Sequence, residues 1–309
     1  MRLVHHYLEL AGGADARRVV SIGNFDGVHV GHAAVLAEAR READARGCEL
    51  AVLTFEPHPS DLLAGGRPKL RLADPAQKEA LLAARGVDVA LFQRFDAAFA
   101  ALDPAAFAAD VLVRAMRAAC VVVGEGFRFG AARAGDFAAL LELGGRLGFS
   151  VIAARLVTLD GESVSSTRIR RAILDGDVAA AHRFLGRPYE ISGEVVRGRG
   201  AGSGLGFPTV NLGGVAVVLP APGIYAARCK VAGATHGAAL YVGERPTLGH
   251  GFSVEAHLLD FAGDLYGARA AIEVLERVRG EARFDGVEAL RAQMARDVAR
   301  IREILGGPA

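Results

Sequence analysis

The chain has 309 residues, 51% of them hydrophobic and 23% charged, and its 36 basic and 35 acidic side chains leave a formal net charge of +1. This composition excludes a disordered chain, and the near-zero charge gives no bulk electrostatic signature for nucleic acid. The length suffices for two domains that each bury a core of their own.

The cysteines and the apolar stretches bear on the compartment. The three cysteines, Cys48, Cys120 and Cys229, lie far apart and form no C-x-x-C pair. This pattern favours free thiols in a reducing compartment over a disulfide framework. The first residues lack the apolar region of a signal peptide, and no stretch approaches the length that spans a bilayer. We therefore expect a cytoplasmic protein without a membrane partner.

The first part of the chain alternates short apolar runs with alanine-rich amphipathic stretches. The expected strands are 19–23, 50–55, 88–92, 120–124 and 150–157, and the expected helices are 31–46, 75–85, 104–116 and 136–147. Such alternation is typical of a mostly parallel sheet with helices on both faces. In such sheets, ligands bind beyond the carboxyl ends of the strands.

A turn after the first of these strands leads into two histidines at helical spacing. The residues of the turn are Gly23, Asn24, Phe25 and Asp26. His29 and His32 follow on one side of the first helical turn. Gly31 between them lets a phosphate approach the backbone, and the helix N-terminus supplies free N–H groups. H-x-G-H is common by chance, but the strand–turn–helix context favours a polyphosphate site for nucleotidyl transfer.

A second candidate anion site lies at Ser166, Thr167 and Arg170, where a short apolar-periodic helix begins. Serine and threonine are frequent N-cap residues, so a helix cap beside a solvated basic face is the simpler interpretation. Hydroxyls, free N–H groups and an arginine at one helix start also bind anions. Together with the histidine pair, this helix start can hold a triphosphate from two directions.

The pattern changes near residue 186 to short strands separated by glycine and proline. The expected strands are 189–197, 223–231, 236–242, 253–259 and 268–278, spaced as in an antiparallel barrel. A terminal helix follows, and we interpret its apolar stripe as packing against the barrel. The residues of the stripe are Val287, Leu290, Met294, Val298, Ile301 and Leu305.

The second half also carries a glycine-rich loop and polar residues on expected strands. The loop glycines are Gly198, Gly200 and Gly206. Such a loop can wrap phosphates, although a simple hairpin loop has the same composition. Thr209 and Asn211 share one strand face and offer neutral oxygens that suit a Mg²⁺ ion carrying nucleotide phosphates. Glu255 is a candidate general base, although an isolated strand glutamate usually faces solvent.

Short motifs recur in order along the whole chain. In the first half they are G-N-F-D-G-V-H-V-G-H at 23–32, T-F-E-P-H-P at 54–59, F-R-F-G at 127–130 and S-S-T-R-I-R at 165–170. In the second half they are L-G-R-P-Y at 185–189, G-F-P-T-V-N at 206–211, P-G-I-Y at 222–225, R-P-T at 245–247, H-L-L-D-F at 257–261, D-L-Y-G at 264–267 and R-F-D at 283–285. The ordered set resembles the prokaryotic bifunctional riboflavin kinase/FMN adenylyltransferase (FAD synthetase) family.

The resemblance implies an α/β plus β fold. Residues 1–186 would form a Rossmann-like FMN adenylyltransferase domain, and residues 187–309 an antiparallel β-barrel riboflavin kinase domain with a terminal helix. The barrel would phosphorylate riboflavin with ATP to give FMN, and the first domain would transfer AMP from a second ATP to FMN, giving FAD and pyrophosphate. The implied cofactor is Mg²⁺ and the implied small-molecule partners are riboflavin, FMN and ATP. Whether the chain forms a homo-oligomer stays open.

The resemblance also implies a role for each candidate residue. In the first domain, His29 and His32 would hold the ATP phosphates and stabilise charge at the reacting phosphorus. The implied nucleotide-binding residues are Gly23, Asn24, Phe25, Asp26, Gly31, Ser166, Thr167, Arg170, Gly198, Gly200 and Gly206. Phe127 and Arg128 would bind flavin. In the barrel, Thr209 and Asn211 would position Mg²⁺-ATP, and Glu255 would activate the ribityl 5′-hydroxyl.

Three positions depart from the family pattern, and one of them, Val210, replaces a usual Ala but keeps Thr209 and Asn211. Gly126 stands where the family usually has Asn or Asp, and Tyr241 stands where it usually has Asn near the flavin end of the kinase site. Two alternatives to the bifunctional enzyme therefore stay open. One is a riboflavin kinase whose first domain is inactive or adenylylates a different acceptor. The other is a flavin- or nucleotide-binding protein without turnover.

Overall fold

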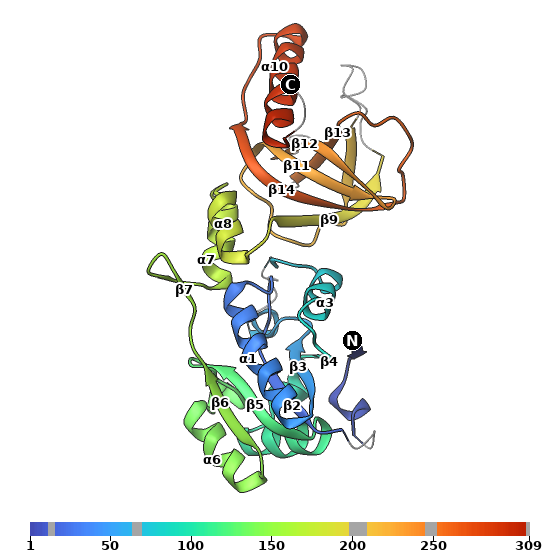
Figure 1. Cartoon of the computed structure of the whole chain (residues 1–309). Helices are drawn as coiled ribbons and strands as arrows, with labels where there is room; N and C mark the ends of the chain where they lie inside the picture. The colour runs from blue at the N-terminus through green and yellow to red at the C-terminus, as the bar shows by residue number, and fades with distance from the viewer. Residues whose placement is uncertain (12–15, 64–69, 198–208, 245–251, 307–309) are drawn as a thin grey trace. The chain divides into compact units, whose positions relative to one another are not determined.

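The computed structural model describes residues 1–11, 16–63, 70–197, 209–244 and 252–306 (Figure 1). By their internal contacts, these residues form two compact units. The first unit comprises Met1–Lys69 and Pro75–Ser165, and the second comprises Leu70–Asp74 and Ser166–Ala309. A short segment from the first half of the chain therefore belongs to the second unit. The domain boundary that we expect at residue 186 stays a prediction.

A six-stranded parallel sheet forms the centre of the first unit, in the order β1-β4-β3-β2-β5-β6. Its strands are β1 (Arg2–Val4), β2 (Arg18–Ile22), β3 (Glu49–Phe55), β4 (Val89–Gln93), β5 (Ala118–Gly124) and β6 (Ser150–Ala154). The chain moves outward from β2 through β3 to β4 and then returns to the other side of β2 at β5. The carboxyl ends of β2 and β5 therefore flank the point where the strand order reverses.

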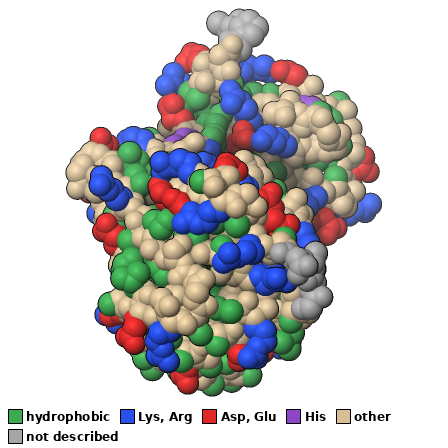
Figure 2. Space-filling view, turned by 60° about the horizontal axis from the view of Figure 1, so that its bottom comes forward, with side chains coloured by type: hydrophobic (Ala, Val, Ile, Leu, Met, Phe, Trp, Pro, Cys, Tyr) green, Lys and Arg blue, Asp and Glu red, His purple; other side chains and the backbone are tan. Residues whose placement is uncertain are grey.

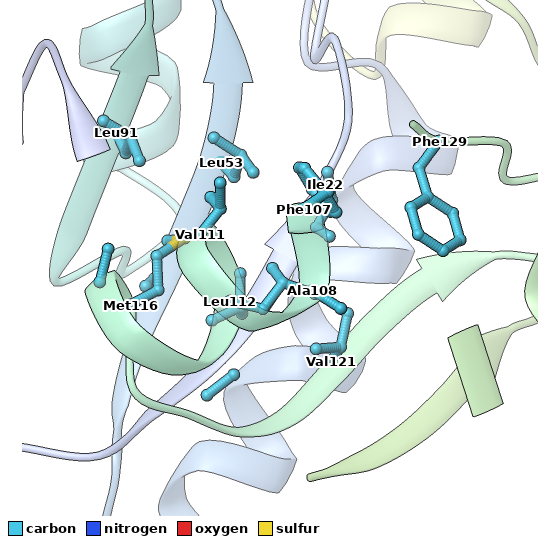
Figure 3. Packing of buried hydrophobic residues seen from close by; sticks show 14 of the residues in the cluster. Ile22, Leu53, Leu91, Phe107, Ala108, Val111, Leu112, Met116, Val121 and Phe129 are labelled. Atoms are coloured by element: carbon cyan, nitrogen blue, oxygen red, sulfur yellow. The ribbon is translucent and has the colours of Figure 1, made fainter. Parts of the chain in front are cut away.

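Helices cover both faces of this sheet, as the alternation of strands and helices predicts. Alternate residues of the buried strands point to opposite faces. One face packs against α1 (Val30–Arg46) and α3 (Pro75–Ala83). The other packs against η2 (Phe107–Ala115) and α6 (Phe137–Leu147). Figure 3 shows this second core, where Ile22, Leu53 and Leu91 from the strands meet Phe107, Val111 and Leu112 from η2.

The remaining elements of the first unit are short. They are η1 (Tyr7–Glu9), α2 (Pro59–Leu63), α4 (Ala97–Ala100), α5 (Pro104–Ala106), η3 (Ala131–Arg133) and the hairpin strands β7 (Thr158–Leu159) and β8 (Glu162–Ser163). The helix expected over 104–116 begins as α5 and widens into the π-helix η2. Its wider turns close on i→i+5 bonds, such as that from the Met116 N–H to the Val111 carbonyl at 2.9 Å.

The second unit is built on a closed antiparallel barrel in the order β10-β13-β12-β11-β14-β9. Its strands are β9 (Tyr189–Val196), β10 (Thr209–Gly213), β11 (Gly223–Val231), β12 (Ala234–Glu244), β13 (Phe252–Leu258) and β14 (Arg269–Gly280). The helices α7 (Ser166–Leu174) and α8 (Val178–Leu185) precede the barrel, and α10 (Val287–Ile304) follows it. The barrel and its terminal helix confirm the expected fold of this half (Figure 1).

Residues 70–74, which we call the strap, pack against the barrel. The Arg71 carbonyl accepts a hydrogen bond from the Val218 N–H at 2.8 Å, and Leu72 and Ala73 are buried. The carboxylate of Asp74 accepts hydrogen bonds from Ser192 Oγ at 2.5 Å and from Arg269 Nη2 at 2.7 Å. Backbone pairing, apolar burial and an ion pair therefore all attach the strap to the second unit.

The surface and the thiols agree with the composition. Basic and acidic side chains are interspersed over the face shown in Figure 2, as expected for a net charge of +1. The three cysteines are free, and Cys120 and Cys229 are buried.

Candidate active sites

The histidine pair lies after the carboxyl end of β2, where α1 begins. His29 is the N-cap residue of α1, and its Nδ1 accepts a hydrogen bond from the His32 backbone N–H at 3.3 Å. A neutral His29 therefore carries its proton on Nε2. The two imidazole rings stack, with centroids 3.7 Å apart and planes 15° apart. The structure thus places both rings together at the helix N-terminus.

The backbone around the pair is shaped by small and strained residues. A Cβ atom on Gly31 would lie 3.1 Å from two atoms of the His29 ring, so glycine leaves room for that ring. Phe25 and Val28 adopt φ values of +47° and +38°, which L-residues rarely adopt. Both side chains are buried, and this packing holds the turn in its strained form.

His32 is held neutral by its surroundings. Its Nδ1 is enclosed and makes no hydrogen bond to the described residues. Burial, followed by the charges of His29 and Lys78, lowers the pKa of His32 well below its ordinary value. A phosphate group placed here would supply both a hydrogen-bond acceptor and a negative charge, and each of these favours the protonated ring.

Lys78 is a residue of this site that the sequence analysis missed. Its side chain is only 4% exposed, and its Nζ lies 3.7 Å from Glu56 Oε2 and 5.4 Å from the centre of the Phe92 ring. Lysine is rarely buried without a partner. In the sequence, its burial was indicated only by its position four residues before Leu82, on the buried face of α3.

A cavity of about 290 Å³ lies at the point where the strand order of the sheet reverses. Gly23 and Asn24 line it after β2, and Gly126 and Phe127 line it after β5. Its aromatic walls are completed by Phe55, Phe95, Phe99, Phe107 and Phe129. This is where open α/β sheets bind their ligands. The predicted flavin-binding residues Phe127 and Arg128 both line this cavity.

Two further groups of predicted residues belong to the second unit. Ser166 begins α7, and Thr167 and Arg170 follow in the same helix, in the second unit. Arg170 Nε donates a hydrogen bond to the Leu70 carbonyl of the strap at 3.0 Å. Their joint action with the histidine pair stays a prediction. The loop glycines Gly198, Gly200 and Gly206 lie outside the described residues.

In the barrel, strand register brings the predicted kinase residues together. Asn211 of β10 pairs with Glu255 of β13, and Glu255 pairs with Tyr241 of β12. Thr209 pairs with His257, two residues along the same face. Directly opposite residues in antiparallel strands have neighbouring side chains, so these polar groups form two adjacent rows.

These rows border a cavity of about 400 Å³ inside the second unit. Thr209, Tyr241, Glu255 and His257 line one side of it. Among the described residues, no cluster of three or more His, Cys, Asp or Glu side chains is placed to hold a metal ion by itself. Thr209 offers a hydroxyl and Asn211 an amide oxygen. This neutral oxygen pair fits a Mg²⁺ ion that brings phosphate oxygens and waters as its other ligands.

The apolar stripe of α10 divides between two surroundings. Ile301 is fully buried and Leu305 packs beside it against the barrel, as expected. Val298 packs against the same core and also lines the cavity. In contrast, Leu290 and Met294 line the cavity and Val287 is exposed. The interpretation of the whole stripe as core packing is therefore wrong for its first half. Helical spacing identifies an apolar face but does not show whether protein or a ligand covers it.

A tyrosine–glutamate pair lies beside this cavity. Tyr241 Oη donates a hydrogen bond to Glu281 Oε1 at 2.8 Å. Burial, followed by the hydrogen bond to Glu281 and the charges of Glu281 and Glu255, raises the pKa of Tyr241 to about 12. A Cβ atom on Gly243 would lie 2.0 Å from Tyr241 Oη, so the phenol occupies the space above that glycine.

Comparison with known proteins agrees with this arrangement. A family described as FAD synthetase matches residues 13–168, and one described as riboflavin kinase matches residues 185–305. The bifunctional riboflavin kinase/FMN adenylyltransferase of Escherichia coli K12 is 39% identical over 309 residues, covering 99% of this chain and 98% of that protein. The chain belongs to the bifunctional riboflavin kinase/FMN adenylyltransferase family.

Other members of the family and one solved structure resemble the chain over its length. The bifunctional riboflavin kinase/FMN adenylyltransferase of Bacillus subtilis 168 is 33% identical over 306 residues, covering 96% of each chain. A crystal structure described as a macrolide-efflux protein from Streptococcus pneumoniae superposes with a TM-score of 0.89 at 30% identity, over 97% of this chain and 98% of that one. In the part of our chain that the structure describes, no helix is long and apolar enough to cross a membrane.

Proposed function

We propose that this chain makes FMN from riboflavin in its second unit and FAD from FMN in its first. The observation that carries the proposal is that each unit has a cavity of its own, bordered by different chemistry. One has aromatic walls and lies at the reversal of a parallel sheet. The other is lined by the acid Glu255 and the hydroxyl of Thr209, which lie on adjacent strands. ATP is the second substrate at both sites, and we expect a cytoplasmic location.

In the first unit, the reaction is the transfer of AMP to the FMN phosphate. An FMN phosphate oxygen attacks the α-phosphorus of ATP, the new P–O bond forms, and the bond to the β-phosphate oxygen breaks to release pyrophosphate. His29 and His32 lie at the start of α1, where N–H groups and a positive dipole favour the phosphates. Their contribution is positioning and charge stabilisation rather than covalent chemistry.

In the second unit, the reaction is phosphorylation of the ribityl 5′-hydroxyl. Glu255 accepts the hydroxyl proton while the oxygen attacks the γ-phosphorus of ATP and ADP leaves. The apolar residues Leu290 and Met294 offer contacts for the flavin ring. Thr209 and Asn211 would hold Mg²⁺, which when bound neutralises phosphate charge.

Two substitutions test whether each unit carries one of the two reactions. His29→Ala is expected to abolish FAD formation and to leave FMN formation largely intact, because the histidine pair belongs to the first unit. Glu255→Gln is expected to lower the FMN-forming kcat about a hundredfold or more, because it removes the base. Purified protein is incubated with ATP, Mg²⁺ and either riboflavin, to follow FMN formation, or FMN, to follow FAD formation, and the flavins are resolved by chromatography over time. Equal loss of both activities in either variant would contradict separate sites.

A further inference from the structure

Ser253 lies beside Glu255 on the wall of the barrel. The two residues are two positions apart on β13, so their side chains share one strand face. Ser253 is 6% exposed, although serine is usually found at the surface. It pairs in register with Gly243, and the phenol of Tyr241 fills the space above that glycine. The serine hydroxyl therefore lies out of contact with most water.

A hydroxyl in such a place needs a hydrogen-bond partner. The partner is the carboxylate of Glu255, because Ser253 Oγ donates to Glu255 Oε1 at 2.7 Å. An ionised carboxylate only accepts hydrogen bonds, so the direction of this bond is fixed. Bonds of this kind, in which the acceptor is charged, are short and strong.

We propose that Ser253 is a positioning residue for the kinase reaction, fixing one oxygen of Glu255 so that Oε2 is presented to the ribityl hydroxyl. This inference rests on the proposed role of Glu255 as the base. A glutamate side chain rotates freely about its last bonds unless an interaction holds it. With Oε1 engaged by Ser253, the carboxylate plane is set before substrate binds, and reacting groups that are held in place react faster.

The test compares steady-state FMN formation by the full-length wild type, Ser253→Ala and Ser253→Thr at saturating Mg²⁺-ATP. Ser253→Ala is expected to lower kcat about tenfold and to change the KM for riboflavin less than about twofold, because the hydroxyl orients the base without contacting the flavin. Ser253→Thr keeps the hydroxyl and is expected to restore kcat to within about twofold of wild type.

A double substitution shows whether Ser253 acts through Glu255. Ser253→Ala in a Glu255→Gln background is expected to cost nothing further, because the group that it orients is already absent. A tenfold loss in that background as well would overturn the proposal, as would an unchanged kcat in Ser253→Ala or failure of Ser253→Thr to rescue it. Thermal unfolding of each variant at the wild-type temperature confirms that its barrel is folded.

Ser192 provides a matched control. It is another buried serine of the barrel, 5% exposed, and its hydroxyl donates to Asp74 of the strap rather than to the cavity residues. Ser192→Ala is expected to leave the kinase kcat unchanged. The outcomes also separate this inference from the proposed function. The proposed function would be refuted if the wild type made no FMN or if Glu255→Gln kept full activity. Only the role of Ser253 would be refuted if the wild type were active, Glu255→Gln inactive and Ser253→Ala fully active.

Discussion

His32 shows how one residue is prepared for a charged ligand. Its ring is kept neutral by burial and by neighbouring positive charge, and its Nδ1 is enclosed without a partner among the described residues. A nucleotide phosphate would give the ring a hydrogen-bond acceptor and a negative charge, and both favour its protonated form. The site therefore disfavours the charged ring while it is empty and favours it when phosphate binds.

The lowered pKa of His32 predicts how stability depends on pH. The unfolded chain has the ordinary histidine pKa of about 6.5, so between that value and the lower folded pKa it binds more protons than the folded chain. The stability contribution of neutral His32 is complete above about pH 6.5 and is lost as the pH falls toward the folded pKa. Urea unfolding over this window is expected to show a shallower pH dependence for His32→Asn than for wild type; identical slopes would contradict the assignment.

Gly243 is predicted to control the state of Tyr241. In Gly243→Ala, the added Cβ would lie 2.0 Å from Tyr241 Oη and 2.6 Å from Glu281 Oε1, so the phenol has to leave Glu281. The pKa of Tyr241 is then expected to fall from about 12 toward the ordinary tyrosine value. Titration of tyrosinate absorbance measures this change, and Tyr241→Phe identifies the transition that belongs to this residue. A wild-type titration curve in Gly243→Ala would show that the phenol had not moved.

Ion pairs of different kinds attach α10 to the barrel. Asp297 is 5% exposed and accepts hydrogen bonds from Arg279 Nε and Nη2, the latter at 2.8 Å. Arg302 also pairs with Asp260, but that pair is exposed. The first pair lies beside the cavity that Leu290 and Met294 line, so it holds the part of the helix that faces the site.

Breaking these two pairs is predicted to have unequal effects. Asp297→Ala leaves Arg279 partly buried without its partner and is expected to lower the free energy of unfolding by about 3 kcal/mol. It should also raise the KM for riboflavin, because the cavity wall loses its anchor. Asp260→Ala serves as the control and is expected to cause no measurable change, since exposed ion pairs contribute little. Equal destabilisation of the two variants in urea unfolding would contradict this account.

The strap contributes to the stability of a unit that is otherwise built from the second half of the chain. Asp74→Ala removes the acceptor of the buried Ser192 hydroxyl, and we expect a loss of about 1–3 kcal/mol. Arg269 adds little to this cost because its side chain is 63% exposed. In thermal inactivation, FMN formation should be lost at a lower temperature than in wild type. Asp175→Ala, which breaks the exposed pair with Arg171, is the control and should not change the temperature at which FMN formation is lost.

Local pattern predicted much of this molecule, and the failures share a physical cause. Apolar runs and helical spacing located the principal strands and the H-x-G-H turn, because these signals are carried by neighbouring residues. Strand β1 is too short to show alternation, and the π-helical turns of η2 have no counterpart in a 3.6-residue period. The pairing of Asn211 with Glu255, the burial of Lys78 and the position of the strap all depend on contacts between distant segments.

The strap also has a consequence for cutting the chain. A single break between Ser165 and Ser166 would leave residues 70–74 on the N-terminal fragment, although they pack in the second unit. That fragment would then carry a peptide ligand for the other, offering the Arg71 carbonyl and the Asp74 carboxylate to groups that remain on the barrel. Two separately made halves would thus be expected to reassociate by fragment complementation, and a barrel fragment made alone would lack one of its own parts.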